Sequence, residues 1–494
     1  MGVVIRQSIK GIIVTYAGAF IGFLIQFFII TRFLSPEDIG LTSVIIEIGI
    51  LFAVLCQLGT SSSIIRYFPY FRNREHTHGG FFFYIVALPV VGSLVFVPLY
   101  LLFKQPIIDF LAKSSPAFTG YFYWIIPLIL FLTYLQVFET YSTVNRRIVV
   151  PKFNREVLVR LLMLAVYLLY GYHFINRSGL ILGMIAVYGL VLLAAFVYVC
   201  RIAPVSMRYR PIPPALGKEM LRYTAYLVAG ALGGTILAKL DLFMISSEMG
   251  YNYSGIFRIA TYMAVIVEIP SRSIAAISAP LAAEALKNGD FATSNTLYQK
   301  VSLHQLLAGG MIFLLLWVNI DTIFALLPNG ALYAGGKWVV FFLGMAKLTE
   351  VTLNFGGQLI SFSKYYYWNL YFVFFIIGIG ILTNLWLIPH LGITGAAVAT
   401  ALTTLLSYSV QQWIVLKKVK GNPYTKSTLK VLLLFALLIG LNSSGFRLQN
   451  PWADGLLRSA VTLFAGALLI YYGRISEEIN RLVDRFFEKA KKSL

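Results

Sequence analysis

Charged residues are scarce in this sequence of 494 residues. Asp, Glu, Lys and Arg together make up 12% of the chain, whereas hydrophobic residues make up 59%. A soluble globular chain carries roughly 25% charged residues, because water must solvate its surface. The low charge therefore excludes a soluble protein and indicates that most of the surface faces a lipid bilayer.

Cysteine and histidine are also rare, and neither has the spacing of metal ligands. Cys56 and Cys200 lie in separate apolar runs, so the sequence predicts neither a disulfide framework nor a zinc site. The five histidines form no zincin or deaminase pattern, and there is no Walker loop for ATP hydrolysis. No large polar segment interrupts the apolar runs, as would be usual for a membrane glycosyltransferase. These absences favour a carrier over an enzyme, and they predict no metal and no cofactor.

The sequence does contain a long series of apolar runs near the ~20 residues that cross a bilayer. Fourteen runs, joined by short connections, are predicted to be transmembrane helices. They cover residues 8–33, 40–65, 80–103, 120–144, 157–175, 179–200, 221–246, 254–279, 298–320, 331–361, 366–388, 392–416, 427–443 and 455–473. The first run is too long for a cleavable signal peptide, so it is expected to remain as a helix.

The basic residues that give the net charge of +20 lie mainly in the predicted loops and tails. With a cytoplasmic N-terminus, 29 of the 40 Lys and Arg residues fall on inner segments and 8 on outer ones, as the positive-inside rule requires. The split predicts an even number of passes with both termini cytoplasmic, and it makes a nucleic-acid partner unnecessary. The helical spacing of apolar residues within 475–494 predicts an amphipathic helix on the inner leaflet, with a surface helix or an oligomer contact as the alternative.

The two halves of the chain resemble each other when one is slid along the other. The shift that sets Gly40 against Gly255 also sets Gln26 of the first run against Asp241 of the seventh, and we call it the repeat shift. Six passes separate the copies, so both halves enter the membrane in the same orientation, as a parallel repeat. The predicted organisation is a six-helix lobe over 1–214, a second over 215–425, two further helices over 426–474 and a cytoplasmic amphipathic tail over 475–494.

Small residues recur at four-residue spacing in the first run, for example Gly18 and Gly22. This spacing favours a close approach of helix backbones. The alternative is that the small residues leave room for a cavity between the lobes.

Ionisable residues inside the apolar runs are functional candidates, because each costs several kcal/mol at membrane depth unless it is paired or meets water. Glu268 with Arg272, and Lys347 with Glu350, are spaced to pair locally on one helix. Arg66 has no acid nearby in the sequence, and snorkelling to the inner interface is the alternative to a binding role.

Lys239 and Asp241 are two residues apart and point to different helix faces, so we expect their partners on other helices. A cationic cavity would suit an anionic group such as a diphosphate. The predicted cavity residues are Arg66, Arg272, Lys239, Asp241, Arg258, Gln26 and Glu47.

Four segments of the chain resemble a known family. They are Ser8–Gly11, Thr31–Gly40, Leu58–Phe68 and Gly255–Arg272, and they are similar to the polysaccharide biosynthesis transporters, the Wzx-type oligosaccharide flippases of the multidrug/oligosaccharidyl-lipid/polysaccharide exporter superfamily. The resemblance implies an all-α polytopic membrane protein of about fourteen helices, in which two six-helix lobes form an alternating-access V.

The resemblance also implies an activity. Such a flippase moves an undecaprenyl-diphosphate-linked oligosaccharide, an O-antigen or capsule repeat unit, from the cytoplasmic to the periplasmic leaflet of the bacterial inner membrane. Its partners would be membrane lipids, a coupling cation (H⁺ or Na⁺), and the polymerase and glycosyltransferases of polysaccharide or lipopolysaccharide biosynthesis. Related lipid II flippases use arginines on their first, second and eighth helices; here only Arg66 and Arg272 lie on comparable helices.

Two alternatives remain at this stage. A multidrug/cation antiporter of the same fold would use Asp241 and Glu47 to exchange a cation, although the cationic bias of the charges at depth argues against it. An integral-membrane glycosyltransferase or ligase would transfer sugar itself.

Overall fold

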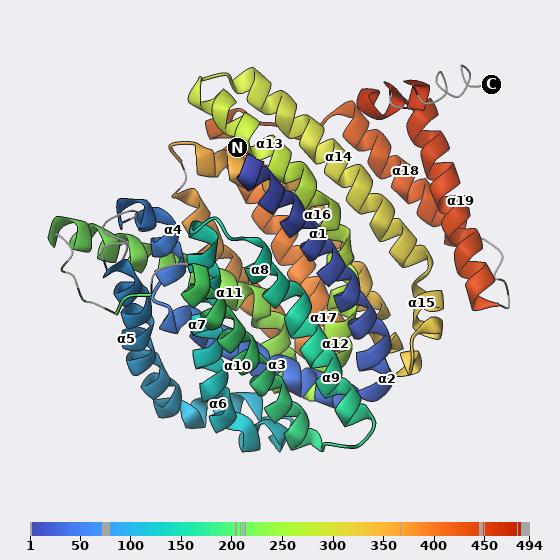
Figure 1. Cartoon of the computed structure of the whole chain (residues 1–494). Coiled ribbons are helices and arrows are strands. Elements are labelled where there is room, and N and C mark those ends of the chain that lie inside the picture. The colour runs from blue at the N-terminus through green and yellow to red at the C-terminus, as the bar shows by residue number, and fades with distance from the viewer. Residues whose placement is uncertain are drawn as a thin grey trace. The chain divides into compact units, whose positions relative to one another are not determined.

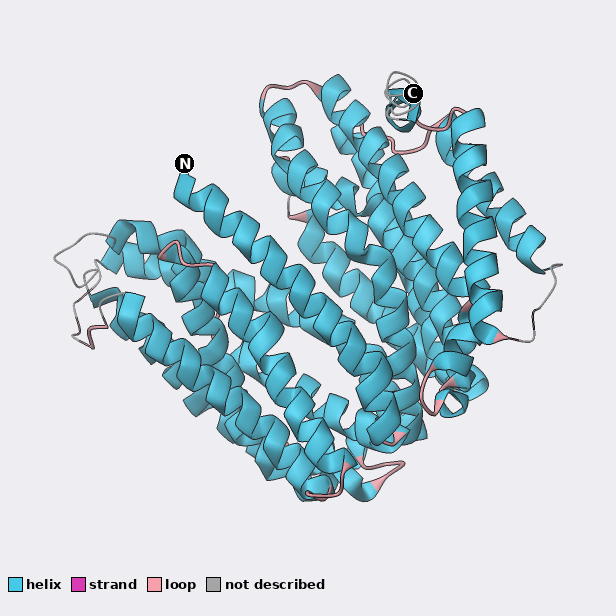
Figure 2. Ribbon diagram, turned by 45° about the vertical axis from the view of Figure 1, so that its right-hand side comes forward, coloured by secondary structure: helices cyan, strands magenta, loops and turns pink. Residues whose placement is uncertain are grey.

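The structure is a computed structural model that describes residues 2–71, 80–202, 205–207, 209, 211, 214–365, 367–443, 448, 450–481 and 483–485. These residues form helices joined by short loops, and no strand occurs among them (Figure 2). Helices satisfy their own backbone hydrogen bonds, which a bilayer interior requires. Each of the fourteen predicted runs coincides with helix, and nine helical segments of the described chain are long and apolar enough to cross a membrane. The predicted all-α polytopic fold is confirmed.

Contacts divide the chain into two compact units, Met1–Arg258 and Ile259–Leu494. The predicted lobe boundary at residue 214 stays a prediction. The helical elements that begin in the first unit (Figure 1) are α1 (Gly2–Leu24), η1 (Ile25–Ile30), α2 (Thr31–Phe33), α3 (Pro36–Cys56), α4 (Thr60–Phe71), α5 (Phe81–Leu102), α6 (Lys104–Leu111), η3 (Pro116–Trp124), α7 (Ile125–Val144), α8 (Val149–Phe153), η4 (Asn154–Leu158), α9 (Val159–Gly171), α10 (Arg177–Ile202), α11 (Pro214–Met249) and α12 (Tyr251–Val265).

The second unit continues the same alternation of long helices and short turns. Its further elements are η5 (Ile266–Glu268), α13 (Ile269–Lys287), α14 (Phe291–Val318), α15 (Ile320–Leu326), η6 (Gly330–Leu332), η7 (Ala334–Gly336), α16 (Lys337–Phe362), α17 (Trp368–Ile414), η8 (Val415–Val419), α18 (Lys426–Ser443) and α19 (Pro451–Tyr472).

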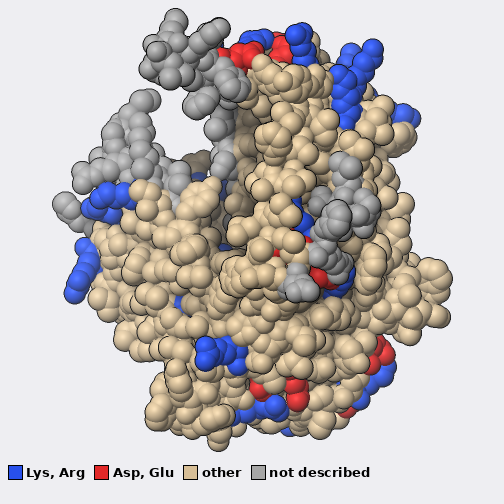
Figure 3. Space-filling view, turned by 90° about the vertical axis from the view of Figure 1, so that its right-hand side faces the viewer, with Lys and Arg blue, Asp and Glu red and all other residues tan. Residues whose placement is uncertain are grey.

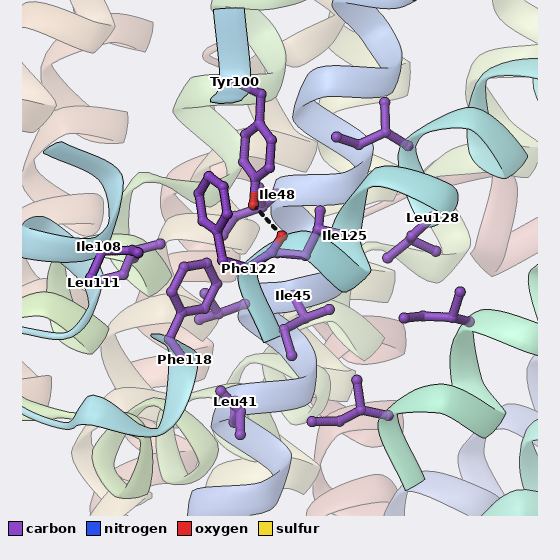
Figure 4. Packing of buried hydrophobic residues seen from close by; sticks show 14 of the residues in the cluster. Leu41, Ile45, Ile48, Tyr100, Ile108, Leu111, Phe118, Phe122, Ile125 and Leu128 are labelled. Atoms are coloured by element: carbon purple, nitrogen blue, oxygen red, sulfur yellow. Dashed lines mark hydrogen bonds between the residues drawn. The ribbon is translucent and has the colours of Figure 1, made fainter. Parts of the chain in front are cut away.

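The core of the first unit forms around one face of α3. Leu41, Ile45 and Ile48, spaced by four and three residues, are buried against α5, η3 and α7 (Figure 4). The ring of Tyr100 on α5 stacks on Phe122 at 4.3 Å between centroids, and its hydroxyl donates to the Phe122 carbonyl at 2.9 Å. This hydrogen bond satisfies a buried phenol that would otherwise be costly at this depth.

Helix α17 is two helical arms separated by a sharp turn at Gly392. The backbone of Gly392 has φ 59° and ψ −140°, a conformation that residues other than glycine rarely adopt. The Thr383 and Thr403 hydroxyls, 20 residues apart in sequence, lie 3.2 Å apart across the turn. The two arms therefore run side by side, which accounts for the two separate runs predicted at 366–388 and 392–416.

The helix boundaries repeat under the same shift that sets Gly40 against Gly255. Helices α3 and α12 begin at Pro36 and Tyr251, and a short outer helix follows in each half, α6 ending at Leu111 and α15 at Leu326. Likewise α10 begins at Arg177, and the second arm of α17 begins after Gly392. Because these bounds coincide to within a residue or two, the repeat extends to the bounds of these helices despite the low sequence similarity. The parallel orientation of the two halves stays a prediction.

The glycines matched by the repeat shift meet in the first unit. A Cβ atom added to Gly40 would lie 2.0 Å from the carbonyl oxygen of Tyr251, and one added to Gly255 would lie 1.8 Å from that of Pro36. Pro36 and Tyr251 are themselves equivalent under the shift. The first turns of α3 and α12 therefore pack on each other reciprocally, and glycine is needed at both contact points.

Ion pairs near the ends of helices join segments that the charge pattern assigns to the same side. At the predicted outer end of the first unit, Arg177 binds Asp38 at 2.6 Å and Lys113 binds Glu248 at 2.8 Å. In the second unit, Lys337 binds Asp321 at 2.6 Å at the outer end. The face in Figure 3 accordingly shows wide uncharged areas between small groups of charged side chains.

The described part of the C-terminal tail packs on the second unit. Lys300 of α14 binds Glu478 at 2.7 Å, and Lys430 of α18 donates to the Gly473 carbonyl at 3.0 Å. Ile475 is buried and Ile479 packs against the same hydrophobic cluster. Residues 486–494 of the predicted amphipathic tail lie outside the described residues. The orientation of this helix on a leaflet stays a prediction.

Candidate functional site

Glu47 is a buried carboxylate in the middle of α3. It is 1% exposed, and its Oε1 accepts a hydrogen bond from Lys239 Nζ of α11 at 2.9 Å and forms an ion pair with Arg258 Nη2 of α12 at 3.0 Å. We call these three residues the Glu47 cluster. The prediction that Lys239 has its partner on another helix is confirmed.

Two cations thus share one carboxylate oxygen at membrane depth. The side chains of Lys239 and Arg258 are 24% and 20% exposed, while that of Glu47 is 2% exposed. An isolated buried charge would cost several kcal/mol, so the carboxylate holds the two cations in place within the helices. Asp241, two residues after Lys239, is half-buried and also makes a polar interaction.

Arg258 lies two turns inside α12, because the helix begins at Tyr251. This explains why a residue near the outer end of a predicted run reaches Glu47. Three of the predicted cavity residues are therefore brought together by the tertiary structure from positions 47, 239 and 258 of the chain.

Arg66 lies on α4 among aromatic rings. Its guanidinium donates to Glu219 at 3.0 Å and lies 4.2 Å from the ring centroid of Tyr223 and 5.3 Å from that of Tyr67. Its side chain is 47% exposed. Arg66 has no acid nearby in the sequence, and its acidic partner is instead Glu219 of α11. Because about half of the side chain is exposed, the guanidinium stays accessible to a further ligand.

The structure gives less detail for the other predicted cavity residues, Gln26 and Arg272. Gln26 is half-buried in the π-helical turn η1, a local geometry that is frequent at functional sites. Arg272 lies on α13, and its side chain is outside the described residues. Their roles in binding stay predictions.

The small residues Gly18 and Gly22 of α1, which we call the glycine stripe, pack against a neighbouring ion pair. Cβ atoms on Gly18 and Gly22 would each come within 2.8 Å of Arg160, which pairs with Glu156 at 3.0 Å. The stripe therefore permits close packing on this face, as its small residues favour. Arg160, counted from the sequence only as an inner-loop cation, is a half-buried residue packed against α1.

A second charged cluster lies in the second unit. Lys347 of α16 binds Glu350 on its own helix at 2.9 Å and Glu268 of η5 at 3.1 Å. The predicted local pair of Lys347 and Glu350 is confirmed, and Glu268 joins it from another element. We call these residues the Lys347 cluster.

A polar cavity of about 300 Å³ adjoins the Lys347 cluster. Its lining combines two acids, three amides, a hydroxyl and an apolar wall: Glu268, Ser271, Gln305, Glu350, Val351, Asn354, Phe355 and Gln358. Sequence reasoning missed the amides. The signal was present, because Glu350, Asn354 and Gln358 recur every four residues on α16, which places them on one helix face.

The first unit has a cavity of about 500 Å³ at the equivalent place. Under the repeat shift Ala53, Leu135, Gln136 and Glu139 of this cavity correspond to Glu268, Glu350, Val351 and Asn354 of the other. Glu139 faces Arg155 at 3.9 Å. The same fold thus builds two cavities, and their side-chain chemistry differs.

These features define a class of protein. The described residues hold no group of three or more His, Cys, Asp or Glu side chains that could bind a metal ion. The chain is a polytopic helical membrane protein in which helix bounds recur between the two halves and charges at membrane depth are paired.

Comparison with known proteins identifies the family. A family model described as "Polysaccharide biosynthesis protein" matches residues 8–284, more than half of the chain, and the protein belongs to this family. No curated protein matches the sequence. The resemblance noted in the N-terminal segments is thereby confirmed.

Solved structures share the fold at low sequence identity. A lipid II flippase MurJ in an inward closed conformation matches with a TM-score of 0.73 and 12% identity, covering 95% of this chain and all of that one. An inward-facing MATE-family multidrug resistance transporter of the MOP superfamily matches with a TM-score of 0.61 and 14% identity, covering 79% and 92%. A MOP-superfamily transporter from Pyrococcus furiosus matches with a TM-score of 0.53 and 13% identity, covering 85% and 95%. These likenesses show the fold, and the titles of the solved structures describe a lipid II flippase and transporters of the MATE family and the MOP superfamily.

Proposed function

We propose that this protein is a flippase for a lipid-linked oligosaccharide in bacterial polysaccharide biosynthesis. The substrate is an undecaprenyl-diphosphate-linked O-antigen or capsule repeat unit, carried from the cytoplasmic to the periplasmic leaflet of the inner membrane. Both termini face the cytoplasm in this proposal, as the distribution of basic residues predicts.

The observation that carries the proposal is the pair of cations on Glu47. A diphosphate crossing the bilayer must exchange water for fixed positive charge, because an unpaired anion at that depth is very costly. Lys239 and Arg258 offer an ammonium and a guanidinium that are both partly exposed. Arg in particular binds phosphate oxygens in a bidentate manner.

Arg66 provides an earlier contact on the same route. It lies on α4, which is separated from α3 and Glu47 by the turn at residues 57–59, and its acid is Glu219 of α11. We therefore assign Arg66 to capture of the headgroup at the inner end, and Lys239 with Arg258 to its passage through the membrane.

The alternative, a multidrug/cation antiporter of the same fold, would require the acid of the Glu47 cluster to be available to a cation. In the structure Glu47 Oε1 is already occupied by Lys239 and Arg258. This favours an anionic ligand over a cationic one.

The test is transport by purified protein in liposomes, using a farnesyl-diphosphate-linked trisaccharide with a fluorophore that external dithionite bleaches. Lys239→Gln together with Arg258→Gln should reduce flipping at least ten-fold, since a hydrogen bond to a charged group contributes about 1.5–3 kcal/mol. The triple variant that adds Glu47→Gln should be equally inactive yet restore stability, because the carboxylate no longer stays unpaired.

Glu47→Gln alone should reduce flipping less than the double variant, since both cations remain although they lose the carboxylate that holds them in place. The matched control is Lys104→Gln, which removes an exposed outer cation that contacts Tyr123. Full flipping by the neutral triple variant, or export of a cationic dye that depends on Glu47, would refute the proposal and favour the antiporter.

A further inference from the structure

We infer that the polar cavity of the second unit binds a sugar ring of the transported glycolipid. This inference rests on the proposed function and adds the place at which the sugar is recognised. The cavity is the one lined by Glu268 and Glu350 of the Lys347 cluster, the amides of α16 and Gln305 of α14.

The repeat shows that the fold does not need these charges. Glu268, Lys347 and Glu350 correspond, under the repeat shift, to Ala53, Leu132 and Leu135. All three of these apolar residues line the equivalent cavity of the first unit. Since the first copy is built with apolar side chains at the same positions, the charged set is an addition for a ligand.

The cluster itself argues against a bare metal cation as that ligand. The ammonium of Lys347 already lies between the two carboxylates, at 2.9 Å from Glu350 and 3.1 Å from Glu268. A hard cation would need several oxygens closing around it at about 2.0–2.6 Å, and the lysine occupies that position.

Two amide oxygens of the lining residues are buried acceptors without a hydrogen-bond donor. Gln305 is 4% exposed and its Oε1 has no hydrogen-bond partner, while its Nε2 donates to the Ser271 carbonyl at 3.5 Å. Gln358 Oε1 is likewise buried without a partner. A buried acceptor without a partner is costly, and turning either amide toward the cavity would bring its oxygen within reach of a sugar hydroxyl.

The size and the walls of the cavity fit a sugar ring. Its 300 Å³ equals roughly ten waters at ~30 Å³ each and lies at the lower end of small-ligand pockets, ~300–1,000 Å³. Val351 and Phe355 form an apolar wall, which suits the C–H face of a pyranose. Amides and carboxylates on the other side suit its hydroxyl edge.

The experiment compares the binding of farnesyl diphosphate with that of its glucosyl, galactosyl, N-acetylglucosaminyl and N-acetylgalactosaminyl derivatives to the purified full-length protein. At least one glycosylated probe should bind more tightly than farnesyl diphosphate. Gln305→Leu and Asn354→Ala should each reduce that advantage about 3- to 10-fold, the effect of losing one or two hydrogen bonds. Binding of farnesyl diphosphate should not change.

The matched control is Thr349→Ala on the same helix, whose hydroxyl bonds to the Met345 carbonyl of α16. If none of the sugars improves binding, or if the improvement survives both cavity variants, the sugar subsite is refuted while diphosphate binding still supports the flippase. If wild-type protein binds none of the five probes, the proposed function fails and the subsite fails with it.

Discussion

The contact between Gly40 and Gly255 predicts a large effect from the smallest possible side chain. Replacing Gly40 by Ala adds one methyl group at the first turn of α3. That Cβ would lie 2.0 Å from the Tyr251 carbonyl oxygen and 2.8 Å from its carbonyl carbon. Both neighbours are backbone atoms of α12, so no side chain can rotate away.

The magnitude follows from this geometry. To reach even 3.0 Å from the oxygen, the two helix ends must separate by about 1 Å, and a packed interior resists such a shift. Overpacking of this kind costs about 1–3 kcal/mol. In a solvated helix the same substitution would instead stabilise by up to about 1 kcal/mol, because alanine has the higher helix propensity.

The assay is the apparent melting temperature of the purified protein in detergent. Gly40→Ala and Gly255→Ala should each lower it by several degrees. Gly234→Ala is the matched control, because it is also helical and its added Cβ meets nothing within 4 Å. The control should leave the melting temperature unchanged or raise it.

The double variant tests the reciprocity. Because both methyl groups force apart the same two helix ends, their costs should not add, and the Gly40→Ala, Gly255→Ala protein should melt close to the worse single variant. Equal melting of Gly40→Ala and Gly234→Ala would show that α3 and α12 are not in this contact. Additive costs would show that the two glycines do not report on one contact.

Two further predictions concern the second unit. Lys347→Met should destabilise the protein by about 1–3 kcal/mol, less than the loss of one partner from a fully buried pair, because the cluster is partly exposed. The variant E268A/K347L/E350L, which carries the residues of the first half of the chain at these positions, should have a melting temperature near that of wild type. Equal melting temperatures of these two variants would contradict the repeat argument. The pKa of Glu478 is lowered, first by the hydrogen bond from Lys300, so the contribution of this pair to tail docking is present above the ordinary glutamate range and is lost as pH falls through the lowered pKa. Proteolysis of the tail should accelerate over that acidic window in wild type and be pH-independent there in E478Q; identical pH profiles would show that the pair does not hold the tail.

Much of the fold could be predicted from the sequence, because the bilayer imposes simple rules. Each run of about 20 apolar residues must form a helix, and basic residues collect on one side. The fourteen predicted runs therefore match helices, including the two arms that meet at Gly392, where turn and run boundary coincide. The repeat could be detected in the sequence, because sliding one half along the other aligns Gly40 with Gly255. The structure adds that the helix ends carrying these two glycines are in contact.

The multi-pass membrane fold, the resemblance to the polysaccharide biosynthesis family and the restriction of charges at depth to a few residues could all be read from the sequence alone. The local pair of Lys347 and Glu350 could be read there too, because residues three apart share a helix face. The pairing of Glu47 with Lys239 and Arg258, and the position of Gln305 beside the amides of α16, became visible only in the folded chain. These groupings join residues that are far apart in the chain, and helix packing, which no local pattern encodes, sets which faces meet.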